Sequence, residues 1–126
     1  MTSDRCCRVF VFLLVLAGEK RGDDRFISRA RQLTFEGRRS GECYFAPDGK
    51  RLLFMSEREQ GNPFFQIYSL DFESGDVDRI SSGRGKTTCP FYQYGTGLVE
   101  YASTHLDENF DAECEAEYAR RREGRK

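Results

Sequence analysis

The sequence predicts an all-β chain with one complete four-stranded antiparallel unit and part of a second, between an N-terminal signal helix and a C-terminal helix. Short aromatic and apolar runs alternate with turns that contain Gly, Pro and Asp. The pattern of apolar residues recurs at an offset of 47 residues. Aromatic residues make up 13% of the chain, which is not a disordered composition.

The composition limits the classes of function that 126 residues can carry. This length corresponds to one domain or less. Lys and Arg total 20 against 21 Asp and Glu, a balance that argues against a broad nucleic-acid-binding face. A single histidine excludes a multi-histidine metal site within the chain.

The start of the chain, residues 1–18, has the pattern of an export signal. Arg5 and Arg8 precede an apolar run over residues 9–17, and a small residue stands before a predicted cut ahead of Gly18. Nine residues span only about 14 Å as a helix, against a bilayer core of about 30 Å, so we expect no transmembrane anchor. We therefore expect a periplasmic or otherwise exported protein. A buried strand or a misassigned start is the alternative.

Export would leave three cysteines in the mature chain, namely Cys43, Cys89 and Cys114. Their spacing contains no Cys-x-x-Cys pair of the kind that binds zinc or performs redox chemistry. Two interpretations stay open. Cys43 and Cys89 form a disulfide, or the cysteines act as small buried apolar side chains.

The first repeat unit contains four predicted strands joined by short polar segments. Pro47-Asp48-Gly49 predicts a tight hairpin turn, because Pro presets φ, Asp caps the turn and Gly adopts the left-handed conformation. The continuous apolar run from Leu52 to Met55 is typical of a strand covered on both faces. The predicted strands are residues 42–46, 50–56, 64–72 and 77–81.

A strand at residues 30–35 is predicted before this unit, and two strands of a second unit follow it. Tyr94-Gly95-Thr96 stands where the second copy should have Pro-Asp-Gly, so we expect a looser hairpin there. The matched positions are Leu33 with Ile80, Tyr44 with Phe91, Phe45 with Tyr92, Phe54 with Tyr101 and Ser56 with Ser103.

Four strands joined by tight turns and repeated at this period describe a β-propeller blade, with an ordinary antiparallel meander as the alternative. Several segments carry a closer likeness: Arg31-Gln-Leu-Thr34, Tyr44-Phe-Ala-Pro-Asp-Gly-Lys50, Leu52-Leu-Phe-Met-Ser56, Gln66-Ile-Tyr-Ser-Leu-Asp71 and Glu73-Ser-Gly-Asp76. Together they resemble the WD40-like repeat of TolB-like propellers, over residues 26–106. The chain holds too few blades to close a propeller, so we expect an incomplete β-propeller, either a fragment or a decayed copy.

Residues 107–126 differ in character and predict a helix with Asp107 as its N-cap. Acidic residues come first and the basic run 120–122 comes near the end, which complements the helix dipole. We interpret that basic run as a solvated helix end, with a phosphate-binding patch as the alternative. In the resembling propellers, an insertion of this kind often separates the second and third strands of a blade. The resemblance therefore implies that residues 107–126 are either a charged helical tail or a truncated insertion. One narrow apolar stripe is predicted, at Leu106, Phe110, Cys114 and Tyr118.

Two segments invite a catalytic interpretation that the surrounding residues do not support. Residues 82–88 end like a phosphate-binding loop, but Ile80 occupies the position of the first glycine and a strand is predicted next. His105 follows Ser103 and Thr104, but no residue pattern supplies a triad around it, so we interpret it as a strand-end histidine.

Two further groups have a structural and a ligand-binding interpretation. Asp48 is interpreted as a turn residue. Asp71 and Asp76 are interpreted as hairpin caps, with cation binding as the alternative. The three aromatic residues Phe64, Phe65 and Tyr68 predict core between blades, with a binding patch as the alternative.

The resemblance implies a non-catalytic protein-interaction scaffold of the cell envelope, as part of an exported TolB-like propeller. A rigid β scaffold with loops at a shared rim favours protein partners, here through loops 57–62 and 81–88. We expect no catalytic residue, no cofactor and no metal ligand in the chain. We also expect no nucleic-acid partner and no stable membrane anchor. Self-association is a further possible interaction, because a second copy could cover the apolar faces of so small a sheet.

Two other hypotheses stay open. Similar repeats accompany the catalytic domains of prolyl-oligopeptidase-like and zinc aminopeptidases, so the chain is alternatively the propeller portion of a peptidase whose catalytic domain lies beyond Lys126. A downstream Gly-x-Ser-x-Gly motif or metal-ligand cluster would distinguish that case. The third hypothesis is a truncated reading frame whose product has no function of its own.

Overall fold

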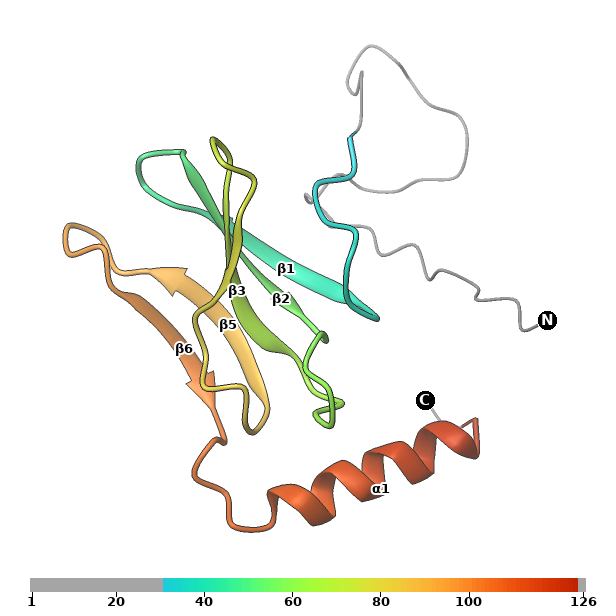
Figure 1. The fold of residues 1–126 in the computed structure, drawn as a ribbon. Coiled ribbons are helices and arrows are strands. Elements are labelled where there is room, and N and C mark those ends of the chain that lie inside the picture. Colours follow the sequence, from blue (N-terminus) through green and yellow to red (C-terminus); the bar gives the residue numbers. More distant parts are fainter. Residues whose placement is uncertain (1–30, 125–126) are drawn as a thin grey trace, which may run out of the picture.

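The computed structural model describes residues 31–124, which form mainly β-structure with one C-terminal helix (Figure 1). The first four strands form one antiparallel sheet in chain order, and β5 and β6 form a second, two-stranded antiparallel sheet. The elements are β1 (Ser40–Phe45), β2 (Arg51–Ser56), β3 (Gln66–Asp71), β4 (Val77–Arg79), β5 (Thr87–Tyr92), β6 (Val99–Ser103) and α1 (Phe110–Arg122).

The predicted signal segment at residues 1–18 lies outside the described residues. Within residues 31–124, no helix is both long enough and apolar enough to span a bilayer. The six strands fall where the sequence predicts strands, with ends shifted by a few residues.

The strand predicted at residues 30–35 is wrong, because residues 31–35 contain no strand. Leu33 contacts the sheet through its side chain, which packs against an apolar cluster on one face. Backbone pairing with the sheet begins only beyond this segment, where Arg38 N–H donates to Glu57 O at 2.8 Å. The apolar residue that suggested a strand therefore covers a sheet face instead of extending an edge.

The hairpins β1–β2 and β5–β6 share one geometry at the offset of the sequence repeat. β1 begins at residue 40 and β5 at residue 87, so the strands recur 47 residues apart. The backbone bonds that close each hairpin at its two ends recur at the same offset. They are Ala46 N–H to Arg51 O (2.8 Å) with Gln93 N–H to Leu98 O (2.8 Å), and Glu57 N–H to Arg39 O (2.9 Å) with Thr104 N–H to Lys86 O (3.0 Å).

Each hairpin also carries an irregularity at the same repeat position. The register shifts within β1 and again within β5. Glu42 (φ 27°) and Cys89 (φ 52°) are the two non-glycine residues with positive φ in the described part of the chain, and they are 47 residues apart. A bulge bends its strand and redirects the side chains that follow it. The second hairpin is therefore a structural copy of the first, including its departure from regular pairing.

The second hairpin turn is not looser at its closure than the first. Its closing bond between Gln93 and Leu98 has the same length as the corresponding bond in the first turn. Thr96 supplies the side-chain contact, because its Oγ1 donates to Gln93 Oε1 at 2.9 Å and accepts from Leu98 N–H at 3.2 Å. In the first turn, Asp48 Oδ1 accepts from Lys50 N–H at 2.9 Å.

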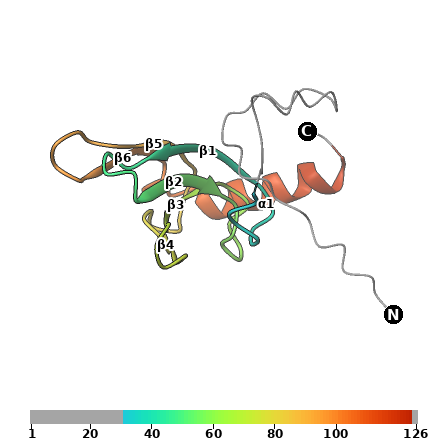
Figure 2. The same cartoon turned by 90° about the horizontal axis from the view of Figure 1, so that it is seen from above.

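Both faces of β2 and β3, the central strands of the first sheet, are buried, as the apolar run in β2 predicts. One face carries a cluster of Leu52, Phe54, Tyr68 and Leu70. The other face carries Leu53, Met55 and Ile67, against which side chains of the second hairpin pack, including Tyr92, Val99 and Tyr101. β5 contacts β1, β2 and β3. Seen from above, the strands β1 to β4 follow one another across the first sheet (Figure 2).

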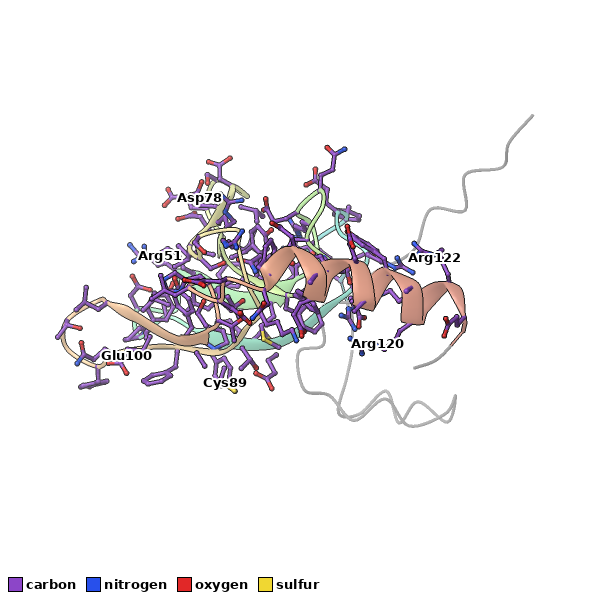
Figure 3. All side chains as sticks on the ribbon, turned by 90° about the horizontal axis from the view of Figure 1, so that it is seen from below. Arg51, Asp78, Cys89, Glu100, Arg120 and Arg122 are labelled. Atoms are coloured by element: carbon purple, nitrogen blue, oxygen red, sulfur yellow. The ribbon has the colours of Figure 1, made fainter. Side chains whose placement is uncertain are left out.

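The three cysteines within residues 31–124 occupy different environments, so neither interpretation of them holds for all three. Cys89 is an exposed free thiol whose side chain points outward from β5, and the Cys43–Cys89 disulfide is therefore absent (Figure 3). Cys43 is half-buried and Cys114 is buried. Burial raises the pKa of the Cys43 and Cys114 thiols. Only Cys114 matches the expectation of a small buried side chain.

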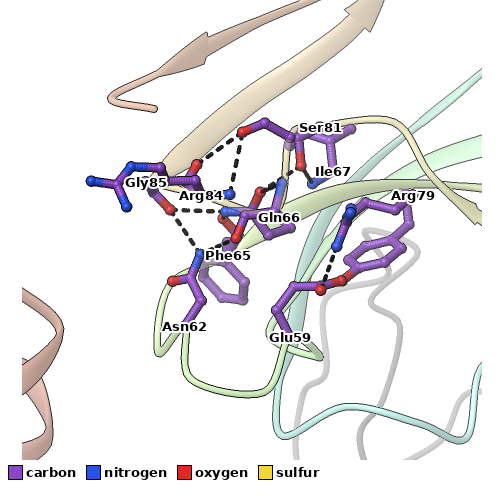
Figure 4. A network of polar contacts seen from close by, with 12 residues as sticks. Glu59, Asn62, Phe65, Gln66, Ile67, Arg79, Ser81, Arg84 and Gly85 are labelled. Carbon is purple, nitrogen blue, oxygen red and sulfur yellow. Dashed lines mark hydrogen bonds and ion pairs between the residues drawn. The ribbon is translucent and has the colours of Figure 1, made fainter. Parts of the chain in front are cut away.

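A buried amide at the start of β3 joins the two repeats (Figure 4). The Gln66 side chain is fully buried, and its Nε2 donates to Phe65 O and to Gly85 O, both at 2.8 Å. Its Oε1 accepts from Ser81 Oγ at 2.7 Å and from Gly83 N–H at 3.0 Å. Every hydrogen-bonding position of the amide is thus used.

Asn62 reinforces these bonds from the loop before β3. Its Nδ2 donates to Gly83 O at 2.9 Å and to Gly85 O at 3.1 Å, and its Oδ1 accepts from Phe64 N–H at 2.9 Å. We call these bonds of Gln66 and Asn62 the Gln66 network. Since the segment 81–87 leads directly into β5, the network determines where the second hairpin begins.

Substitution of Gln66 tests the network. Gln66→Leu keeps the size of the side chain but leaves buried donors and acceptors without partners, so we expect a loss of about 2–4 kcal/mol in the free energy of unfolding, measured in urea. Gln60→Leu is the control, because Gln60 is exposed. Equal stability of the two variants would contradict this account of the network.

A pair of glycines tests the close approach of the segment 81–87 to the end of β6. Gly85 has φ +77°, and a Cβ added there would lie 2.6 Å from the backbone nitrogen of His105. Gly95 has φ +79° with open space around it. We expect Gly95→Ala to cost about 1–2 kcal/mol for the left-handed backbone, and Gly85→Ala to cost at least about 2 kcal/mol more in thermal or urea unfolding. Similar costs at both positions would show that the approach is not tight.

Candidate functional site

The two loops predicted to bind partners contribute much of their surface to the fold itself. In the loop 57–62, Glu57 and Asn62 are buried, with exposed fractions of 7% and 3%. In the loop 81–88, Ser81 and Thr87 are buried, and Ser81 belongs to the Gln66 network. These side chains hold the loops in place and are not available to a partner.

Helix α1 lies against these same loops (Figure 1). Arg121 is the principal contact at the C-terminal end, where its Nη1 is 2.6 Å from Glu57 Oε1 and its Nη2 donates to Pro63 O at 2.6 Å. Nearer the N-terminal end, Lys86 Nζ is 2.6 Å from Glu113 Oε2. The helix therefore covers part of the rim that sequence analysis left open to partners.

The basic helix end is not uniformly solvated, which corrects the interpretation of residues 120–122. Arg120 and Arg122 are exposed on α1 (Figure 3). The Arg121 side chain is only 15% exposed and also pairs with Glu117 at 2.7 Å. That hydrogen bond lowers the pKa of the Glu117 carboxyl, and the bond to Glu57 raises the pKa of Arg121.

The start of α1 differs from the prediction. Asn109 occupies the N-cap position, not Asp107, and makes no side-chain capping bond. Asp107 instead forms the turn before the helix, since its Oδ1 accepts from Asn109 N–H at 2.9 Å. The predicted apolar stripe is also incomplete. Leu106 is 83% exposed. The Phe110 ring is instead covered by the Arg84 guanidinium, whose central carbon lies 4.4 Å from the centroid of that ring.

The segment 82–88 forms no phosphate-binding loop. Its glycine carbonyls accept from Asn62, and the Gly83 N–H donates to Gln66. The segment leads into β5 and not into a helix, as predicted. Backbone groups that would face a phosphate in such a loop are therefore used within the fold.

The structure does place a hydroxyl against the single histidine, a contact that no residue pattern in the sequence predicts. Ser103 Oγ lies 3.0 Å from His105 Nδ1 and also accepts from His105 N–H at 3.2 Å. Both contacts span two residues of an exposed turn at the end of β6. A local turn explains this pair without a nucleophile.

The aspartates act as turn residues. Asp71 Oδ1 accepts from the backbone N–H groups of Glu73 and Ser74, at 2.8 and 3.0 Å, and these bonds lower the pKa of Asp71. Asp76 closes the same hairpin through its backbone O, which accepts from Asp71 N–H at 2.9 Å. Across residues 31–124, no cluster of His, Cys, Asp and Glu could hold a metal ion.

The three aromatic residues before and within β3 belong to the interior. Phe64 and Tyr68 are buried, and Phe65 packs against the cluster between the sheets. Arg58 lies 5.1 Å from the Tyr68 ring centroid, and Tyr68 Oη donates to Glu59 Oε1 at 2.7 Å. Burial raises the pKa of Tyr68 and lowers the pKa of Arg58. This region is a packed core and not a binding patch.

The best candidate for a partner-binding surface is an aromatic groove at the turn ends of the two hairpins. The groove has a volume of about 530 Å³. Its most accessible rings are Tyr94 (90% exposed), Phe45 (54%) and Phe91 (47%). The lining residues are Tyr44, Phe45, Pro47, Phe91, Tyr92, Tyr94 and Gly95.

Four of these residues match across the 47-residue repeat, but the match alone does not predict a site. The signal was present, since Tyr44 and Phe45 recur as Phe91 and Tyr92. What the sequence does not reveal is the packing of β5 on the first sheet, which brings both aromatic pairs to one groove. Large exposed aromatic surface on a small protein is a mark of interaction sites.

The docking of α1 is tested at Arg121. Arg121→Met removes one of the two positive charges that pair with the buried Glu57 carboxylate, the other being that of Arg39. We therefore expect α1 to detach more readily from the sheet, and the free energy of unfolding to fall by about 1–3 kcal/mol. Limited proteolysis within α1 and urea unfolding measure the two effects. Arg122→Met is the control on the exposed side of the helix end. If both substitutions act alike, the Arg121 contacts do not hold the helix.

The described surface thus offers one aromatic groove, while the two predicted loops are engaged in the fold and with α1. No family model matches this chain, and neither a curated protein nor a solved structure matches it.

Proposed function

We propose that this chain is a non-catalytic protein-interaction scaffold, built as two repeats of an exported, TolB-like incomplete β-propeller. The observation that best supports the scaffold is the recurrence of one bulged hairpin, which positions two aromatic pairs side by side in the aromatic groove. Rigid repeats with a shared surface favour binding through that surface. In this proposal the partner contacts the groove and not the loops 57–62 and 81–88.

The partner segment we propose is an extended, proline-rich peptide. The groove offers ring faces from both hairpins together with Pro47, and apolar pyrrolidine rings pack well on such faces. Tyr44, Tyr92 and Tyr94 contribute hydroxyl groups, and Arg51 lies 5.9 Å from the Tyr92 ring centroid. These groups donate hydrogen bonds. A proline-rich polyproline II segment presents unpaired carbonyl oxygens and few N–H groups. It therefore offers mainly hydrogen-bond acceptors, which suit a groove lined by donors.

The proposal includes no catalytic step. The Ser103 hydroxyl accepts from the backbone N–H of its own turn, and its pair with His105 is exposed. A serine nucleophile needs a histidine that a third group orients. The exposed turn supports a structural role for both side chains.

Titration with decaproline tests the groove. The amide NMR signals of the ¹⁵N-labelled chain should shift in a saturable way at residues 44–46 and 91–95. Phe91→Ser removes a central ring face and should weaken binding at least about tenfold. Phe35→Ser is the matched control, because Phe35 is 73% exposed and does not line the groove.

A Gly-Ser peptide of the same length serves as the ligand control and should cause no saturable shift. The proposed partner chemistry is wrong if decaproline causes none either at millimolar concentration. It is also wrong if Phe91→Ser and Phe35→Ser bind decaproline equally well, or if the shifts map to residues 57–62.

A further inference from the structure

The outer edge of β6 exposes backbone groups that no described strand pairs. β6 pairs only with β5 among the described strands. Leu98 O accepts from Gln93 N–H, and Thr104 N–H donates to Lys86 O, so both of these residues direct backbone groups toward the β5 side. Because backbone groups alternate in direction along a strand, those of Val99, Tyr101 and Ser103 point away from β5.

The other strand edges in residues 31–124 carry features that discourage added strands. β1 and β5 are both bulged. β4 has three residues, and two of them are the exposed, charged Asp78 and Arg79. Bulges, short length and charge are the usual ways in which proteins protect sheet edges. β6 has regular pairing at its ends, five residues and a single charge, at Glu100.

In the first repeat, the edge that corresponds to the outer edge of β6 is paired with a further strand. β2 is the counterpart of β6 at the 47-residue offset, and its outer edge pairs along its whole length with β3. The residues at the β3 offset in the second repeat, 113–118, lie within α1 instead. A two-stranded sheet by itself has only marginal stability in water, so pairing with an added strand would stabilise the β5–β6 sheet.

We propose that β6 pairs in antiparallel fashion with β6 of a second copy of this chain, which makes one four-stranded sheet across a two-fold axis. The register is centred on Tyr101, which lies opposite Tyr101 of the second copy. Val99 then lies opposite Ser103, and Glu100 opposite Ala102. This pairing is independent of the proposed peptide groove, which lies at the turn ends of the hairpins.

The side chains favour a second copy as the occupant because this register is self-complementary. Tyr101, Val99 and Ser103 are the residues whose N–H and C=O groups face the edge, so each forms a hydrogen-bonded pair with its opposite. Glu100, the single charged residue of the strand, lies opposite the small Ala102 and not opposite a like charge. Both Glu100 and Ala102 are exposed, so nothing on that face obstructs the second copy.

Two charge variants at one exposed position test the register. Ala102→Glu places like charges opposite Glu100 at both symmetric pairs, whereas Ala102→Lys places opposite charges there. In sedimentation equilibrium, the 126-residue chain should populate a dimer of twice 14.6 kDa. Ala102→Glu should raise the dimer dissociation constant at least about tenfold, and Ala102→Lys should leave it unchanged or lower it.

Amide hydrogen exchange provides a second measurement on the unmodified chain. The Tyr101 N–H should exchange more slowly as protein concentration rises, while the exposed turn at Tyr94 should not change. Phe91→Ser should remain dimeric, which separates this proposal from the peptide groove. A monomer at 100 μM would overturn the proposal. A dimer that Ala102→Glu and Ala102→Lys affect equally would overturn it too, because another surface would then hold the copies together.

Discussion

The relative position of the two sheets depends on one buried amide. Gln66 uses all of its donors and acceptors, and three of its partners, Ser81, Gly83 and Gly85, belong to the segment that leads into β5. A buried amide that lacked any of these bonds would cost free energy, so the segment has one favoured conformation. The second hairpin therefore starts at a defined place and direction relative to β3. Its apolar side chains then cover Leu53, Met55 and Ile67.

This constraint also separates the structural end of the molecule from its accessible end. The loops that the Gln66 network holds also meet α1, whose Arg121 reaches the buried Glu57. Charged and polar contacts thus fill the end that sequence analysis assigned to partners. At the opposite end, the two hairpin turns leave ring faces exposed around Tyr94 and Phe91. The surface available for recognition is therefore aromatic, and two copies of one hairpin generate it.

The sequence predicts the parts of this structure that local chemistry determines. The Pro47-Asp48-Gly49 turn, the apolar run of β2 and the 47-residue period all have local causes, and the structure has the corresponding elements. Long-range contacts decided most of the rest. Leu33 packs on a sheet face and forms no strand, and Arg121 reaches Glu57 from the helix end that was expected to be solvated. The helix start differs for a local reason, because the Asp107 carboxylate accepts from Asn109 N–H in the turn before the helix. The aromatic groove needs both hairpins in place, so no local pattern could reveal it.

The central claim is that the two hairpins pack face to face as copies of one unit. Nuclear Overhauser contacts in the 126-residue chain test it most directly. The account predicts contacts between the methyl groups of Leu53 and Ile67 and the rings of Tyr92 and Tyr101, because these side chains share one cluster. The same spectra should place the positive-φ residues at Glu42 and Cys89. The account would be contradicted if these methyl-to-ring contacts were absent while the backbone signals showed that each hairpin is folded.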